Sequence, residues 1–235
     1  MAQHRMCLRL WSSWRAVVPA CAALLLVSAC AGKAGLSGTA GPIYAPVFDG
    51  SETFVAKTSP VPQWTAVMAR HDRELKSRDS IPAEWRRLVK ELNGLSLRDK
   101  IERVNAEINR YRYVPSALNW GRPDYWETPF EFLAKNGQCQ DYAATKYFLL
   151  RAAGVPANDL RVVVVQDSQA QLAHAVVVVD PYGEALLLDN QITEVVPLVV
   201  AHRYTPLYAL NEEGWWVLKA RPRAPWLGRY AQAGN

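Results

Sequence analysis

The chain has 235 residues, half of them hydrophobic, and its 27 basic and 22 acidic side chains give a formal charge of +5. This length supports one well-packed domain and leaves too little for a second. Three of the arginines lie within the first fifteen residues and no run of Lys and Arg occurs elsewhere, which excludes the usual signatures of nucleic-acid binding and of polybasic membrane binding.

Residues 1–29 have the composition of an export signal. Arg5, Arg9 and Arg15 provide a positive start, and the apolar stretch 16–29 is too short to span a bilayer comfortably. Removal of this segment lowers the formal charge from +5 to +2. The mature protein is therefore expected to be exported, with nearly balanced charge.

The signal ends in Leu-Val-Ser-Ala-Cys at 26–30, which resembles a bacterial lipobox. Cys30 is therefore predicted to become the lipid-bearing N-terminus, although an ordinary secretory signal with a chance cysteine is the alternative. Ala31 stands where an aspartate would retain a lipoprotein at the inner membrane, so the resemblance implies sorting to the outer membrane. Residues 30–60 are rich in small residues and proline, and they are predicted to form a flexible tether.

Helical periodicity begins after the predicted tether. Apolar residues recur at helical spacing over 63–77, over 80–93 and from Ser96 onward, where Asp99 suggests a capping box. The stretch 119–129 is polar, aromatic and punctuated by proline, and it is predicted to be a loop.

The second half of the chain changes from helical to strand patterns after a further helix predicted over 139–153. The predicted strands are apolar, and they cover 160–166, 172–179, 185–188 and a hairpin over 204–218. Helices followed by an antiparallel sheet predict the α+β class. The domain is placed at 61–222, with 223–235 as a C-terminal tail.

The cysteines single out one thiol. Cys7 and Cys21 leave with the signal and Cys30 is predicted to be acylated, which leaves Cys139 without a cysteine to pair with. Since exported proteins normally pair their structural cysteines, such a thiol is either a small buried hydrophobe or a nucleophile. Cys139 lies at the predicted start of a helix, where backbone N–H groups stabilise a thiolate or an oxyanion.

A nucleophilic cysteine requires a histidine. His4 leaves with the signal, His71 lies among charges on an amphipathic helix and is expected to be solvated, and His202 is expected to be exposed or structural. His174 instead interrupts the apolar strand 172–179. On its own, such a histidine is more often a satisfied core residue than a catalytic one.

The turn after this strand favours the catalytic interpretation. Residues 180–183 have the composition of a four-residue type I turn, Asp-Pro-Tyr-Gly. In the register that this turn sets, Val179 faces Glu184 and His174 faces Asp189. Opposed side chains have Cβ atoms about 4.5–5.5 Å apart, which allows an imidazole–carboxylate hydrogen bond. A slip of one residue would break this pairing.

The sequence also resembles the bacterial transglutaminase-like cysteine proteinases, whose best-known branch is the LapG type of periplasmic protease. The resemblance covers about 63–218, and its motifs occur in the family's order: Trp120-Gly121, Asp124 to Pro129, Gly137 to Ala143, Lys146-Tyr147, His174-Ala175-Val176, Leu188-Asp189-Asn190 and Gly214-Trp215-Trp216. It implies a transglutaminase-like, papain-like core with N-terminal helices packed on an antiparallel β-sheet. It also implies that Cys139 is the nucleophile, His174 the general base and acid, and Asp189 the residue that orients the imidazole.

One motif departs from the family. The family's signature places acids on both sides of the cysteine, and in the LapG type these acids help to bind calcium. Here Gln138 and Gln140 replace them, and Asp141 is the acid that remains next to the nucleophile. Calcium prefers several carboxylate oxygens, so any calcium site is expected to be weak and no cofactor is expected to be required. The same replacements bring into question recognition by the inner-membrane cyclic-di-GMP receptor that restrains LapG-type proteases.

Together these observations predict a lipid-anchored periplasmic thiol protease that acts on a protein substrate and not on nucleic acid. By analogy with the family, the substrate is a large cell-surface adhesin whose cleavage releases biofilm cells. Two alternatives remain open. An amine could take the acyl group, as in a transglutaminase-type acyl transferase, or the chain could be a non-catalytic lipoprotein that binds or scaffolds other proteins.

Overall fold

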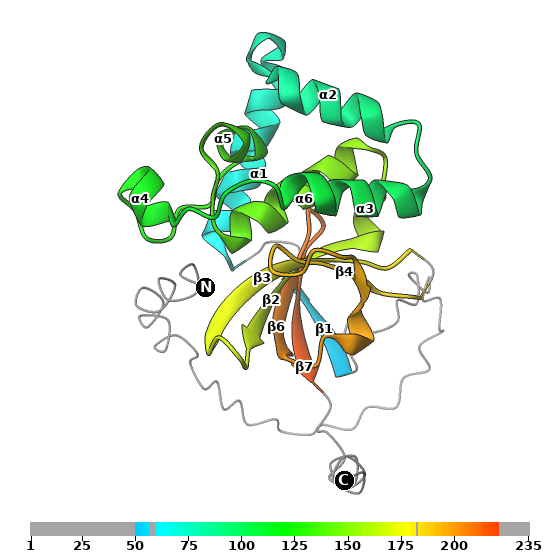
Figure 1. Ribbon diagram of the computed structural model, residues 1–235. Helices are drawn as coiled ribbons and strands as arrows, with labels where there is room; N and C mark the ends of the chain where they lie inside the picture. The colour runs from blue at the N-terminus through cyan, green and yellow to red at the C-terminus, as the bar shows by residue number, and fades with distance from the viewer. Residues whose placement is uncertain (1–49, 57–59, 182, 221–235) are drawn as a thin grey trace, which may run out of the picture.

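A computed structural model describes residues 50–56, 60–181 and 183–220 of the chain. The helices gather on one side of a seven-stranded sheet whose strands are ordered β1-β7-β6-β2-β3-β4-β5 (Figure 1). Every neighbouring pair in the sheet is antiparallel. The α+β class and the packing of helices on an antiparallel sheet are therefore confirmed.

The elements in chain order are β1 (Gly50–Ala56), α1 (Pro62–Lys76), η3 (Arg78–Ser80), α2 (Ala83–Leu92), α3 (Leu97–Ile108), α4 (Ser116–Trp120), α5 (Pro129–Lys135), α6 (Cys139–Ala152), η4 (Ala157–Asp159), β2 (Leu160–Asp167), β3 (Leu172–Val179), β4 (Leu186–Leu188), β5 (Val196–Pro197), η5 (Leu198–Val200), β6 (Tyr204–Leu210) and β7 (Trp215–Ala220).

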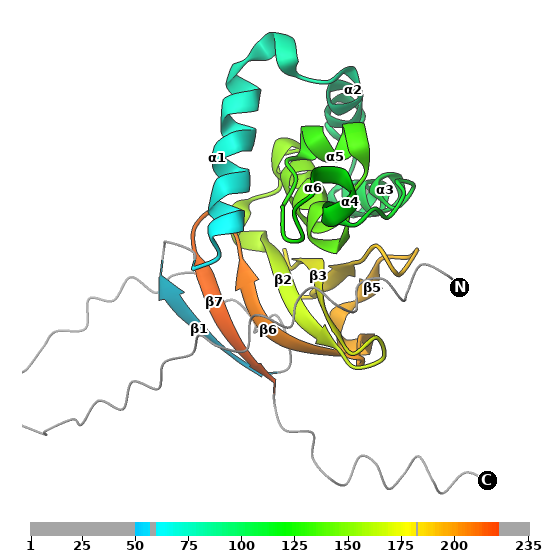
Figure 2. The ribbon, with the colours of Figure 1, turned by 90° about the vertical axis from the view of Figure 1, so that its left-hand side faces the viewer.

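The helices α1, α2, α3 and α6 form where the apolar periodicity predicts them. Ser96 caps α3 through its hydroxyl, which accepts a hydrogen bond from the backbone N–H of Asp99 at 3.2 Å. Helix α6 packs against α3, α5, β2 and β3, and its side chains are buried from Gln140 to Tyr147. This packing fixes the N-terminus of α6 relative to the sheet. In the turned view of Figure 2, α6 lies among the other helices above the strands.

The middle of the sheet is covered on both faces. Leu160 and the four valines 162–165 of β2 are each at most 1% exposed. Val162 belongs to the cluster beneath the helices, whereas Val163 and Val165 belong to a second cluster with Tyr204 on the other face. Burial on both faces explains why the central strands are continuous apolar runs rather than alternating ones.

The predicted loop 119–129 is bordered by two short helices that the sequence analysis missed. Helix α4 overlaps its start, and α5 begins at its last residue. Thr128 and Glu131 form a capping box at the start of α5, with Pro129 at the first helical position. These capping residues are a helix-start signal that the aromatic and polar composition of the loop obscured.

The predicted tether 30–60 is wrong at its C-terminal end. Residues 50–56 form β1, an edge strand that pairs antiparallel with β7, so they belong to the folded domain. Glu52 of β1 forms an ion pair with Arg161 of β2, and the Arg161 guanidinium lies 4.2 Å from the centroid of the Trp216 ring. Because the partner strand lies more than 150 residues away, local composition gave no indication of this pairing.

The predicted signal 1–29, the lipid attachment at Cys30 and the tail 223–235 lie outside the described residues. Across the part of the chain that is described, no helix combines the length and apolar character needed to cross a membrane.

Replacement of Glu52 with Ala tests whether β1 contributes to the fold. The side chains of Arg161 and Glu52 are 5% and 12% exposed, so removal of the carboxylate should lower the free energy of unfolding by about 3 kcal/mol in urea titration. Asp72→Ala is the control, because its ion pair with Lys76 is exposed, and the expected change is below about 1 kcal/mol. Equal effects of the two substitutions would contradict the buried role of Glu52.

Candidate active site

Helix α6 presents Cys139 at its first position. Gln138, the N-cap residue, is extended, and its backbone N–H donates to Oδ2 of Asp141 at 2.9 Å. Cys139 is a free, half-buried cysteine. The first N–H groups of a helix have no carbonyl partner within it, and they form the positive end of the helix dipole. The predicted helix start is confirmed, and it places the thiol where an anion is stabilised.

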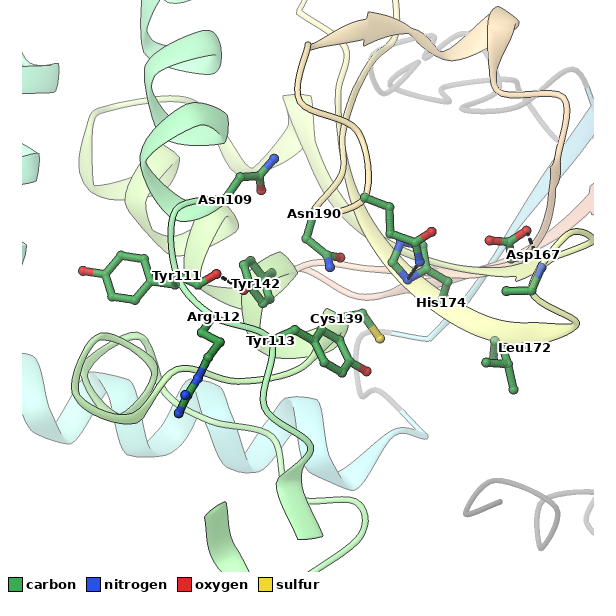
Figure 3. Close-up of a pocket in the computed structure, with 13 residues that line it drawn as sticks. Asn109, Tyr111, Arg112, Tyr113, Cys139, Tyr142, Asp167, Leu172, His174 and Asn190 are labelled. Atoms are coloured by element: carbon green, nitrogen blue, oxygen red, sulfur yellow. Dashed lines mark hydrogen bonds between the residues drawn. The ribbon is translucent and has the colours of Figure 1, made fainter. Parts of the chain in front are cut away.

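The three side chains singled out in the sequence lie together. Nε2 of His174 is 2.7 Å from Oδ1 of Asp189, and Cys139 lies close enough to the imidazole to raise its pKa. Figure 3 shows the Cys139 side chain and His174 on the wall of one cavity. His174 is 4% exposed and Asp189 is 1% exposed, so the imidazole–carboxylate pair is shielded from water.

The contact between His174 and Asp189 arises from a different register than the one predicted. Val179 pairs with Leu186, two residues further along the chain than predicted. Continued along the two strands, this register would place Gln191 opposite His174. A slip of two residues keeps each side chain on its original face of the sheet, so Asp189 remains on the face of His174 and reaches it diagonally.

The electrostatic environment favours an imidazolium next to a carboxylate. Burial opposes a charged imidazole, but hydrogen bonds and charges from Asp189 and Cys139 outweigh it and raise the pKa of His174 to about 9. Burial likewise opposes the Asp189 anion, but His174, Tyr204 and the backbone N–H of Gln191 lower the pKa of Asp189 to about 2. Because the unfolded histidine has a pKa of about 6.5, the raised value stabilises the fold fully below pH 6.5, and this contribution is lost as the pH rises through about 9.

Three residues that the sequence analysis did not single out surround this pair. Tyr204 donates its hydroxyl to Oδ2 of Asp189, and Arg203 donates to the same hydroxyl. Gln191 donates its backbone N–H to Oδ1 of Asp189 at 2.9 Å, and its Nε2 is 3.4 Å from Nδ1 of His174. The adjacent residues Arg203 and Tyr204, at the start of a predicted strand, gave only weak evidence of a role in the site. Their contact with Asp189 depends on the order of strands in the sheet.

The loop that carries Asp189 is held by helix α3. Asn109 donates to the carbonyl of Asp189 at 2.8 Å, and Asn105, one turn earlier, donates to the carbonyl of Thr193 at 2.9 Å. Oδ1 of Asn105 accepts from the buried ammonium group of Lys146 at 2.7 Å. Burial lowers the pKa of Lys146 to about 7, against the opposite effect of the Asp189 charge. Lys146 and the two asparagines therefore fix the carboxylate through the backbone.

The thiol and imidazole open onto a cavity of about 450 Å³. Aromatic and amide side chains line it beside the two reactive groups, among them Tyr111, Tyr113 and Asn190 (Figure 3). This volume is in the usual range for ligand-binding clefts. The cavity joins the α3–α4 connection, the start of α6, the start of β3 and the loop after β4, so it depends on the tertiary fold.

Behind Cys139, two buried carboxyl groups approach the backbone of Gly137. Glu127 and Asp141 are both 0% exposed. A Cβ placed on Gly137 would lie 2.7 Å from Oδ2 of Asp141 and 3.0 Å from Oε2 of Glu127. Burial raises the pKa of both carboxyl groups, and the nearby Glu127 raises that of Asp141 further. Glycine is therefore required at 137 so that these acids can pack beneath the start of α6.

Of the other histidines, His71 differs from the prediction. It was expected to be solvated, but it is 3% exposed and packs against the rings of Trp85, Phe130 and Phe148. Asp72 and Arg73, its neighbours in the sequence, are exposed, while the histidine faces the core. His202 is exposed, in agreement with one of the two placements expected for it.

The fold and the site define a class of protein. The profile of the bacterial transglutaminase-like cysteine proteinase family matches residues 56–221, and this chain belongs to that family. It is therefore a cysteine peptidase with a transglutaminase-like fold, and the predicted family membership is confirmed.

The solved structures that resemble this chain include LapG of Legionella pneumophila. The calcium-bound form of that protein matches with a TM-score of 0.55 and 28% identity, covering 66% of this chain and 91% of LapG. The EGTA-treated form matches with a TM-score of 0.54 and 28% identity, covering 63% and 84%. No curated protein matches this chain.

The side chains beside Cys139 do not fit a calcium site. The two oxygens of Asp141 accept from the backbone N–H groups of Glu127 and Gln138, at 2.8 and 2.9 Å. Oε1 of Gln138 accepts from another backbone N–H at 3.3 Å, and Oε1 of Gln140 lies 3.5 Å from the sulfur of Cys139. Within the described ranges, no three His, Cys, Asp or Glu side chains are grouped so as to hold a metal ion. Since calcium takes six to eight oxygen ligands, the side-chain oxygens of Gln138, Gln140 and Asp141 are too few to hold it.

Substitution of Gly137 with Ala tests the packing beneath α6. The added Cβ would overlap Asp141 and Glu127, so the free energy of unfolding should fall by about 2 kcal/mol. Gly94→Ala is the matched control, because a Cβ there meets nothing within 4 Å. Denaturant unfolding of the two variants checks the prediction, and equal stability would refute the close packing at 137.

Proposed function

We propose that this chain is a periplasmic thiol endopeptidase in which Cys139, His174 and Asp189 form the catalytic triad. The observation that carries the proposal is the hydrogen bond between the His174 imidazole and the Asp189 carboxylate, with Cys139 and His174 lining one cavity of about 450 Å³. A nucleophile, a base and a group that orients the base are the parts that acyl transfer requires.

The tautomer of His174 follows from the chemistry of its partner. The Asp189 carboxylate only accepts hydrogen bonds, so Nε2, at 2.7 Å, carries the proton. Nδ1 is then left to accept the proton of the Cys139 thiol. The product is a thiolate–imidazolium pair, and the Asp189 charge stabilises its imidazolium.

The proposed reaction has two halves. The Cys139 thiolate attacks a backbone carbonyl of the substrate, and the backbone N–H of Cys139 stabilises the oxyanion that forms. His174 gives the proton on Nδ1 to the leaving amine, the C–N bond breaks, and a thioester to Cys139 remains. A water molecule then gives a proton to Nδ1 and attacks the thioester, which releases the acid and restores the thiol.

We further propose that the enzyme acts on an exported protein while anchored to the outer membrane through an acylated Cys30. The lipobox-like residues 26–30 support the anchor. By analogy with the LapG type, the proposed substrate is the periplasmic part of a large adhesin, so that cleavage would release biofilm cells. An inner-membrane receptor is the regulator that the analogy implies, and Gln138 and Gln140 stand where the family has acids.

Cys139→Ala tests the proposed nucleophile. Mature protein and the variant are incubated with periplasmic portions of large adhesins from the same genome, and the products are identified by mass spectrometry. The variant should lose at least about 10³-fold in cleavage rate.

Because the side chains beside Cys139 do not fit calcium, we propose that the cleavage rate of the native protein is equal with and without chelator.

Two arms of this experiment separate the alternatives. An added primary amine that becomes joined to the cleaved substrate would indicate acyl transfer instead of hydrolysis. No cleavage together with slow labelling by a thiol-reactive probe at pH 6 would indicate a non-catalytic binding protein. Cleavage that survives in Cys139→Ala would overturn the proposed triad.

Asp189→Asn tests the third member through the pH profile. In the native enzyme the imidazolium loses its proton near pH 9, since the pKa of His174 is raised to about 9, so activity should fall on the alkaline side with a midpoint near that value. The amide removes the negative charge that raises this pKa, while burial continues to lower it. The alkaline limb should therefore move to lower pH by at least about one unit. An alkaline limb at an unchanged pH would show that Asp189 does not raise the pKa of the imidazole.

A further inference from the structure

Gln140 lies beside the sulfur that the proposed reaction uses. Oε1 of its carboxamide is 3.5 Å from Sγ of Cys139, and the residue is only 6% exposed. Nε2 of the same carboxamide is buried and has no hydrogen-bond partner. A buried amide donor without an acceptor is unfavourable, and such groups at functional sites often serve another state of the site.

The thiol and the thiolate form hydrogen bonds with opposite ends of the carboxamide. A neutral thiol can donate weakly to Oε1, which is the contact present. A thiolate can only accept, so it would repel Oε1 and would attract an N–H group. A half-turn about the last side-chain bond exchanges Oε1 and Nε2 with little change in shape. The same rotation brings the unpartnered N–H group onto the sulfur.

We propose that Gln140 donates a hydrogen bond from Nε2 to the Cys139 thiolate, and is thus a further residue that contacts the reacting atom. This inference rests on the proposed role of Cys139. Gln140 supplies an uncharged hydrogen-bond donor to the sulfur. This donor adds to the His174 imidazolium and the N-terminus of α6. A glutamate of the same shape would only accept hydrogen bonds, and its charge would oppose ionisation of the thiol.

The remaining titratable groups that interact with Cys139 come from three elements. They are His174 of β3, Asp141 of α6 and Tyr208 of β6. All three are unchanged when residue 140 alone is substituted. A change in the ionisation of the sulfur can then be assigned to the carboxamide.

The test is the pH dependence of alkylation of Cys139 by iodoacetamide in the mature protein. Gln140→Met keeps the length of the side chain and removes the donor, so the pH of half-maximal alkylation should rise by about one unit. Gln140→Glu should raise it further. Gln138→Met is the matched control on the other side of the cysteine, because Gln138 bonds a backbone N–H rather than the sulfur, and its midpoint should stay in place.

Coincident midpoints for Gln140→Met and the native protein would overturn the proposal, even if Gln140→Glu shifts through its charge. Should both variants misfold, the ¹⁵N resonance of the Gln140 amide in the native protein replaces them. That resonance should titrate together with the thiol, and a constant value would overturn the proposal. Alkylation needs no substrate, so failure of the proposed function would appear separately, either as no cleavage by the native protein or as cleavage that survives in Cys139→Ala.

Discussion

A carboxylate in a protein interior remains ionised only where hydrogen bonds replace the water that it has lost, and the arrangement around Asp189 meets this condition. Its oxygens accept from the His174 ring, the Tyr204 hydroxyl and the backbone N–H of Gln191. Each donor comes from a different element or loop, so the charge joins β3, β6 and the segment after β4. The orientation of the imidazole is therefore a consequence of how the sheet is assembled.

The sequence predicted most of the elements because their patterns are local. The helix that begins at Cys139 and the strand 172–179 were placed by apolar periodicity, by β-branched runs and by glycine and proline at their ends. The edge strand β1 was missed because its partner β7 is distant in the chain. The pairing of His174 with Asp189 was predicted from a turn that proved longer, and it survived because a two-residue slip preserves the face of a strand.

The residues that hold the proposed catalytic side chains in position were harder to predict from the sequence. Asn105, Asn109 and Lys146 are polar residues in or next to predicted helices, and only the fold brings them to the loop that carries Asp189. His71 shows the converse, since charged neighbours concealed a side chain that packs among aromatic rings. Polar residues that act through tertiary contacts carry no periodic signature, and their roles became apparent only from distances.

The two ends of the described domain are register partners: Gly50 of β1 faces Ala220 of β7. Cα atoms of such partners are about 5 Å apart, so the first and last described residues lie together at one corner of the sheet. Three strands separate β1 from β3, which carries His174. Adjacent ends of the described domain, remote from the reactive groups, suit circular permutation, and they would allow the domain to be inserted into a surface loop of another protein.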